Sequence, residues 1–132
     1  MNPRFDSIAP CFPVADVGAT MLWYQEELGF NGDPFPQFAP YVFAILRRDG
    51  IEIMLQRVEA YQKPDIYARR GGGVWDAYFR MAGVRELYDS VRERVTIIQP
   101  LRQQPYDAWE FEIEDPNGYV LVFSEVYERT AT

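Results

Sequence analysis

The sequence of 132 residues contains no histidine, and Cys11 is its single cysteine. One cysteine cannot form an internal disulfide, and this usage fits a reducing cytoplasm. The absence of histidine removes the imidazole that zinc, nickel and non-haem iron sites favour. Composition therefore predicts a cytoplasmic protein in which a metal would have to rely on other donors.

Long apolar runs and an excess of positive charge are also missing. No apolar stretch approaches the length of a membrane span, and the first ten residues lack a signal-peptide pattern. Acidic residues outnumber basic ones by 20 to 13, which gives a net charge of −7. Because phosphate backbones are bound by basic patches, we expect neither a membrane nor a nucleic-acid partner. The acids that gather late in the chain either attract a cationic molecule or form a solvated face.

Apolar and aromatic residues are plentiful, and two stretches of them repeat each other. Residues 43–56 (FAILRRDGIEIMLQ) can be laid over residues 111–124 (FEIEDPNGYVLVFS), so that Phe43 meets Phe111 and Gly50 meets Gly118. Each stretch predicts a strand, a glycine turn and a second strand. The repeat indicates a duplicated module.

The rest of each half follows the same order. The elements expected in the first half are a strand over residues 5–14, a helix from Asp16 to Gly29, a proline-rich loop with one short strand over residues 32–40, and a hairpin over residues 41–56. The elements expected in the second half are a strand over 74–81, a helix with apolar positions from Val84 to Val91, a strand over 95–101 and a hairpin over 109–126. We therefore predict an α+β fold of two tandem βαβββ modules in a single domain, 1–132. The first module covers 1–57, a connector covers 58–73, and the second module covers 74–132.

Two segments resemble the vicinal oxygen chelate superfamily, which includes glyoxalase I, bleomycin resistance proteins and extradiol dioxygenases. The opening segment runs from Phe12-Pro13-Val14-Ala15-Asp16-Val17 through Trp23-Tyr24 to Leu28-Gly29-Phe30, and the closing segment is Asp115-Pro116-Asn117-Gly118 with the strand after it. The resemblance implies a curved sheet around a cleft, and a homodimer. The modules would pair within one chain or exchange with a second copy.

In metalloenzymes of that superfamily four strands supply metal ligands, and the resemblance places them at Ala9, Met54, Asp76 and Val122. Only Asp76 could bind a metal there, so we expect no metal and no cofactor. A register two residues away keeps the same strand face. It brings in Glu52, Gln56 and Ser124, and the set Glu52, Gln56 and Asp76 remains an alternative metal site.

Strand alternation predicts a cleft with an apolar lining and a few polar anchors, as small-molecule sites need. The predicted ligand-binding residues are Phe43, Glu52, Met54, Asp76, Tyr78, Trp109, Phe111 and Val122. The alternative is that the aromatic members fill the core, and that Asp76 pairs with Arg80 or faces solvent. Trp23 and Trp75 are expected on other faces. No catalytic residue is expected, because Cys11 and Ser124 lack a histidine base.

The sequence thus predicts a metal-independent small-molecule binding protein of the bleomycin-resistance type. It would sequester a bulky aromatic or cationic compound, such as an antibiotic. The alternatives are a metal-dependent glyoxalase-like lyase, isomerase or dioxygenase, and a protein-interaction module.

Overall fold

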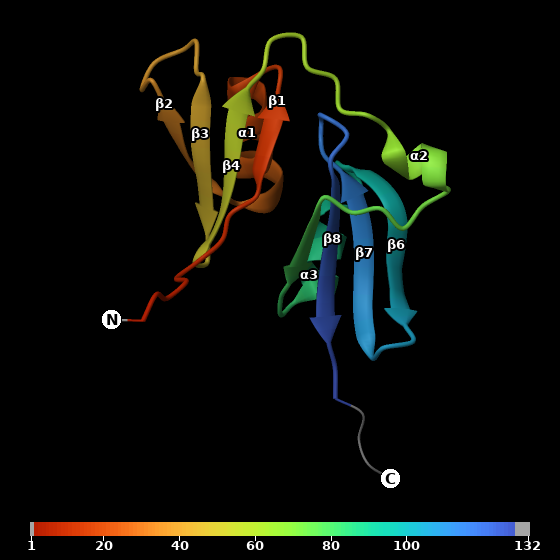
Figure 1. Cartoon of the computed structure of the whole chain (residues 1–132). Helices are drawn as coiled ribbons and strands as arrows, with labels where there is room; N and C mark the ends of the chain where they lie inside the picture. Colours follow the sequence, from red (N-terminus) through yellow and green to blue (C-terminus); the bar gives the residue numbers. More distant parts are fainter. Residues whose placement is uncertain (1, 129–132) are drawn as a thin grey trace. The chain divides into compact units, whose positions relative to one another are not determined.

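The computed structural model describes residues 2–128, and the chain divides into two compact units, Met1–Gln62 and Lys63–Thr132. Each unit holds one four-stranded sheet with a helix against it (Figure 1). The elements of the first unit are β1 (Cys11–Val14), α1 (Val17–Leu28), β2 (Asn31–Phe35), β3 (Phe43–Arg48) and β4 (Ile51–Arg57). The elements of the second unit are α2 (Ile66–Arg70), β5 (Ala77–Arg80), α3 (Val84–Val91), β6 (Thr96–Gln104), β7 (Ala108–Glu114) and β8 (Val120–Val126).

The two sheets have the same topology. Their strand orders are β1-β4-β3-β2 and β5-β8-β7-β6, and in each sheet the first strand runs parallel to the last while the other pairs are antiparallel. The helix between the first two strands makes the crossover that a parallel pair requires. The predicted pair of βαβββ modules is confirmed. No helix within residues 2–128 is long and apolar enough to cross a membrane.

Helix α1 begins and ends where its capping residues predict. The Asp16 carboxylate accepts a hydrogen bond from the Ala19 amide at 3.0 Å, and Gly29 adopts the left-handed conformation with φ 69°. Its amide donates to the carbonyl of Gln25 at 3.2 Å, which satisfies a carbonyl at the end of the helix. On the face toward the sheet, Tyr24 and Leu28 are buried.

Helix α3 satisfies its first amides differently. Its N-cap is Gly83, which has no side chain, and the carboxylate of Glu125 from β8 accepts from the amides of Gly83 and Val84 at 3.0 Å each. A carboxylate there also faces the positive end of the helix dipole. The corresponding position of the first sheet holds Arg57. The carboxylate that accepts from the first amides of the helix therefore belongs to the N-cap residue Asp16 in the first unit and to the strand residue Glu125 in the second.

The first strand is shorter than predicted, since β1 covers only Cys11–Val14 of the expected 5–14. Within residues 2–10, the backbone is joined to the sheet by the Met54 amide, which donates to the Pro10 carbonyl at 2.9 Å. Proline has no amide to donate to a strand ladder, and β1 begins just after Pro10. Phe5 and Ile8 precede the strand and are almost fully exposed. Similarly, β5 begins at Ala77 rather than at residue 74.

Candidate functional site

One face of the first sheet is covered by α1 and the other is open. The covered face carries Ala44, Leu46, Ile53 and Leu55, all at most 1% exposed. On the open face, the register pairs Phe43 with Gln56 and Arg47 with Glu52, and Met54 lies between them. Phe43, Glu52 and Met54 therefore share one face, as the strand alternation predicts.

The polar groups of this open face are already bonded to one another. Arg47 donates to Glu52 at 3.0 Å and forms a second ion pair with Asp33 at 3.5 Å. The hydrogen bond to Glu52 raises the pKa of Arg47, so the guanidinium stays charged. Glu52 consequently has a cationic partner before any ligand or metal arrives.

Asp76 is also paired, but with a different partner from the one that the sequence suggests. Its carboxylate lies 3.2 Å from the Lys63 ammonium and accepts the Val120 amide at 2.8 Å. Arg80, the partner suggested by strand alternation, lies over the Tyr78 ring instead, 5.4 Å from its centroid. Both carboxylates of the alternative metal set, Glu52 and Asp76, are therefore neutralised within their own units.

The four metal positions implied by the resemblance do not fit a metal. Ala9 and Val122 have no donor atom, Met54 offers a soft thioether, and the one carboxylate, Asp76, is already ion-paired. A catalytic divalent ion needs about three protein donors. Across residues 2–128, no group of three His, Cys, Asp or Glu side chains comes together to supply them.

In the second sheet the register divides the predicted site residues between two faces. The predicted site has Trp109 and Phe111 lining one cleft with Val122, but Phe111 pairs with Phe123 and Trp109 with Glu125. A shift of one residue moves a side chain to the other face of a sheet. Trp109 and Phe111 therefore lie on the face toward α3, and not on the face of Val122.

The length of the turn explains the error. Phe43 pairs with Gln56, whereas the partner of Ser124, the counterpart of Gln56, is Glu110. Two residues separate β3 from β4 and five separate β7 from β8, and this odd difference displaces the strand before the second turn by one residue when the two glycines are aligned. The structural counterpart of Phe43 is Glu110, and not Phe111.

The side chains on the α3 face of the second sheet pack as a core. Phe111 is fully buried, with the rings of Tyr88 and Phe123 each 5.1 Å from it. Trp109 lies beneath the guanidinium of Arg85, which is 5.1 Å from the ring centroid, and lines a pocket of about 260 Å³. Of the two readings offered for Phe111, this position supports core packing.

The face of the second sheet opposite α3, called its open face below although its side chains are nearly buried, carries two carboxylates that were not among the predicted site residues. Glu110 and Glu112 alternate along β7, and the register places them beside Ser124 and Val122. They are only 3% and 5% exposed. Burying a charged carboxylate is costly unless hydrogen bonds satisfy it, so their partners define what this face can bind.

Glu110 is held between two phenols. Tyr78 donates to one of its oxygens, and Tyr106, from the loop before β7, donates to the other at 2.5 Å. The ring of Trp75 lies 5.6 Å from the ring of Tyr78. Glu110 therefore sits within an aromatic surround, with neutral donors on both oxygens.

Glu112 is bonded by two further aromatic side chains. The indole of Trp75 donates to one oxygen at 2.6 Å, and the hydroxyl of Tyr67, from α2, lies 3.3 Å from the other. Trp75 therefore belongs to the open face, whereas we expected it on another one. No lysine or arginine within residues 2–128 forms an ion pair with Glu110 or Glu112. The face thus combines four aromatic rings with two carboxylates that form no ion pair among the described residues, and the one cation on the same face, Arg80, lies over the Tyr78 ring.

Tyr78 and Tyr106 should retain their protons above pH 10. Burial, followed by the hydrogen bond to Glu110, raises the pKa of both hydroxyls above the usual 10.0. The folded state then holds protons that the unfolded state releases, so the stability from these bonds is complete below about pH 10 and falls as pH rises further. Absorbance at 295 nm should show a late-titrating fraction of the nine tyrosines, and the Tyr78→Phe/Tyr106→Phe variant should lose it. A single step near pH 10 in both proteins would contradict this assignment.

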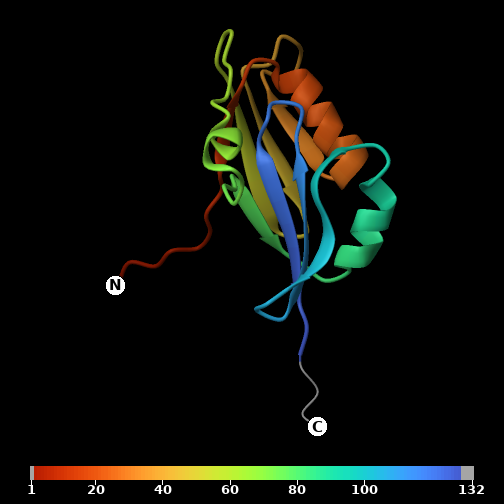
Figure 2. The same cartoon turned by 90° about the vertical axis from the view of Figure 1, so that its right-hand side faces the viewer.

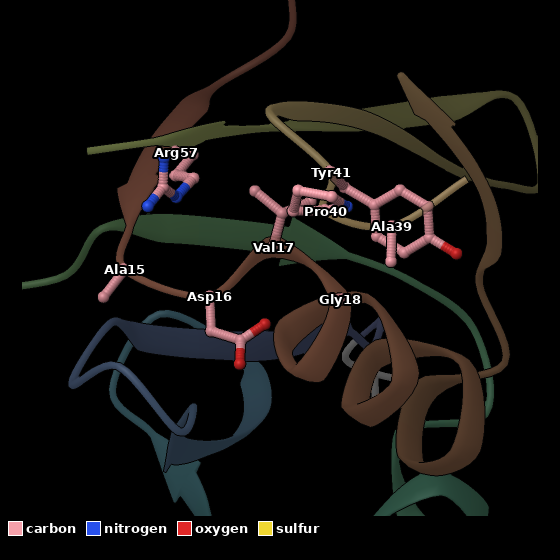
Figure 3. A pocket seen from close by; sticks show the side chains of 8 residues that line it. All are labelled: Ala15, Asp16, Val17, Gly18, Ala39, Pro40, Tyr41 and Arg57. Carbon is pink, nitrogen blue, oxygen red and sulfur yellow. The ribbon is translucent and has the colours of Figure 1, made fainter. Parts of the chain in front are cut away.

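A pocket of about 360 Å³ lies beside the start of α1 (Figure 3). The ring of Tyr41 and Pro40 lie toward one end, and Arg57 lies toward the other. Arg57 forms no ion pair with any residue that the structure describes, and the Asp16 carboxylate is occupied in capping the helix. None of the predicted site residues lines this pocket, so it is distinct from the open faces.

Comparisons with known proteins identify the fold. No protein-family model and no curated protein matches the sequence. Among solved structures, TioX from Micromonospora sp. ML1 matches with a TM-score of 0.74 at 20% identity, over 93% of this chain and 100% of that one. A glyoxalase-related enzyme from Clostridium phytofermentans matches with a TM-score of 0.74 at 18% identity, over 95% and 98%.

A third match is the bleomycin-binding protein from bleomycin-producing Streptomyces verticillus, complexed with copper(II)-bleomycin. Its TM-score is 0.68 at 23% identity, over 96% of this chain and 100% of that one. Identities this low carry information about architecture rather than about activity. The chain has the fold of the glyoxalase, bleomycin resistance and dioxygenase proteins, which is the vicinal oxygen chelate fold.

Proposed function

We propose that this chain is a metal-independent small-molecule binding protein that sequesters a bulky aromatic or cationic compound, such as an antibiotic. The observation that carries the proposal is the open face of the second sheet. Glu110 and Glu112 are nearly buried there, form no ion pair with a base in residues 2–128, and lie among aromatic rings. Sparse polar groups within an apolar and aromatic surround are typical of small-molecule sites.

A cationic ligand would satisfy this face better than the neutral donors do. Hydrogen bonds between a charged donor and a carboxylate are roughly twice as strong as neutral ones. The rings of Tyr78 and Trp75 could pack on an aromatic ligand, adding about 0.5–1.5 kcal/mol for each well-placed pair. The net charge of −7 would also attract a cation from a distance.

The proposed ligand contacts lie within the second unit and differ from the sequence-based set. Tyr78 and Val122 remain, and Glu110 and Glu112 join them on the same face. Trp109 and Phe111 leave, because they lie on the α3 face. Phe43, Glu52 and Met54 belong to the first unit and are not included, and Asp76 is left out because it is ion-paired with Lys63. A cytoplasmic homodimer, expected from the single cysteine and from the resemblance, completes the proposal. The bleomycin-binding neighbour supports ligand binding by this fold.

The proposal predicts that Glu110→Gln weakens binding of a cationic aromatic molecule by at least tenfold. Glutamine keeps the size of the side chain but removes the charge. Isothermal titration calorimetry with ethidium, and separately with bleomycin, would measure the effect. The matched control is Glu114→Gln, which removes a charge from an exposed position of the same strand and should change the affinity less than twofold.

Two outcomes would contradict the proposal. One is equal loss of affinity in both variants, which would indicate a general effect of net charge. The other is no binding of either probe by the wild-type protein, together with no small molecule co-purifying in native mass spectrometry.

A further inference from the structure

The segment between α2 and β5 crosses the open face of the second sheet. In Figure 1 the chain leaves α2 and passes over the strands to reach β5, and Figure 2 shows α2 on the side of the strands opposite α3. The contacts agree, because Tyr67 of α2 bonds Glu112 whereas Tyr88 of α3 packs on Phe111, which lies on the other face. We call residues 66–75 the strap.

Both ends of the strap are held by one carboxylate. Tyr67 lies near its start and Trp75 is its last residue, and they bond the two oxygens of Glu112 at 3.3 and 2.6 Å. Just outside the strap, Lys63 and Asp76 form an ion pair at 3.2 Å. The strap is therefore a loop whose base is closed by an ion pair and whose body is fastened to Glu112.

Beyond Glu112, the strap is fastened by Gln99, which donates to the Tyr67 hydroxyl at 3.4 Å, and by the ring contact of Trp75 with Tyr78. None of its residues is buried, and α2 is a single short helix without a buried side chain. Segments with few buried apolar contacts open at low free-energy cost. Release of the strap would also let water reach the Glu112 carboxylate, which offsets part of the cost of losing its two hydrogen bonds.

The hinge of the strap lies among three consecutive glycines. Gly71, Gly72 and Gly73 have φ angles of 82°, 110° and 72°, a region that residues with a Cβ rarely adopt. No side chain or backbone atom lies within 4 Å of the space that a Cβ would fill at Gly71 or Gly73. The amides of Gly71 and Gly72 donate to the Tyr67 carbonyl at 2.9 and 3.0 Å and close α2, so Gly73 is the position where the backbone can rotate without displacing a packed neighbour.

We propose that the strap is a gate over the open face of the second sheet. Glu112 is its latch, because the two hydrogen bonds to this carboxylate hold the strap in place. A ligand carrying a cationic N–H group takes over the Glu112 oxygens, Tyr67 and Trp75 are released, and the strap swings about Gly73. This inference rests on the proposed function for the identity of the ligand, but the latch itself exists in the ligand-free protein and can be tested there.

The latch predicts faster amide exchange in the strap when Glu112 changes. Glu112→Gln removes the charge and leaves one oxygen to accept hydrogen bonds, so one of the two aromatic partners is freed. Hydrogen–deuterium exchange, followed by mass spectrometry, should show residues 66–75 exchanging at least tenfold faster than in the wild type, with β7 and β8 unchanged. Tyr67→Phe, which removes one hydroxyl, should give a smaller increase, and Glu114→Gln should give none.

Ethidium provides the second arm of the experiment. Its binding to wild-type protein should speed exchange of the strap as Glu112→Gln does. The gate is overturned by unchanged strap exchange in Glu112→Gln, by an increase spread evenly over the second unit, or by ethidium binding that leaves the strap protected. If the strap exchanges faster in Glu112→Gln but the wild-type protein does not bind ethidium, the role of Glu112 in holding the strap is supported. The proposed binding of a cationic aromatic ligand is then contradicted.

Discussion

Replacing Phe111 with alanine is expected to lower the free energy of unfolding of the second unit by about 3–5 kcal/mol. Phe111 is fully buried on the α3 face, and its ring packs against Tyr88 and Phe123. Truncation would remove these contacts and leave a cavity between the sheet and α3, because the surrounding structure relaxes only in part. Urea denaturation followed by circular dichroism would measure the loss.

The control for this prediction is Phe43→Ala. Phe43 was also expected to contact ligand, but it lies partly exposed on the open face of the first sheet. Its truncation should cost clearly less, about 1–2 kcal/mol, because an exposed site leaves no closed cavity. If Phe111→Ala kept full stability and lost only ligand binding, the placement of Phe111 in the core would be wrong.

The fold was predictable because its signals are local. Asp16 and Gly29 define the ends of α1 through hydrogen bonds to residues three or four positions away. The hairpin turns are marked by Gly50 and Gly118, both of which have positive φ angles. Each of these features can be recognised from a few neighbouring residues, and their repetition at a fixed spacing is enough to define two equal modules.

The candidate site was less predictable because it depends on strand parity. The turn that contains Gly118 has five residues and the turn that contains Gly50 has two, and this odd difference decides whether Phe111 or Glu110 lies on the face of the sheet opposite the helix. Placing Gly50 over Gly118 hides this difference in turn length. A signal was present nonetheless: Glu110 and Glu112 alternate with Phe111 and Ile113, and an apolar face toward the helix is the usual arrangement in a module of this kind.

Contacts from the connector could not be predicted from the sequence at all. Tyr67 reaches Glu112 from 45 positions away, and Lys63 reaches Asp76 across the whole strap. Neither pair lies on a shared helix or strand, so no periodicity links them. The acidic charge that looked like a solvated face therefore includes two carboxylates that are almost completely buried.

Lys63→Met is expected to destabilise the second unit by about 1–3 kcal/mol. Lys63 is the only lysine of the sequence, and its side chain is 9% exposed and lies 5.5 Å from the centre of the Tyr119 ring. Methionine keeps most of the volume but removes the charge, which leaves Asp76 without a cation. Removing one partner of a fully buried pair costs about 3–5 kcal/mol, and the loss should be smaller here because Asp76 is 23% exposed and keeps the Val120 amide.

The control Lys63→Arg retains the positive charge and should recover at least half of that loss in urea denaturation. The same pair also separates two roles for Asp76. If Asp76 served mainly as an anchor for a cationic ligand, Lys63→Met would expose it and tighten ethidium binding while stability stayed constant. Because the ion pair closes the base of the strap, we expect the opposite: lower stability, faster exchange of residues 66–75, and no gain in affinity. A stable Lys63→Met variant that binds ethidium more tightly would assign Asp76 to the ligand rather than to the fold.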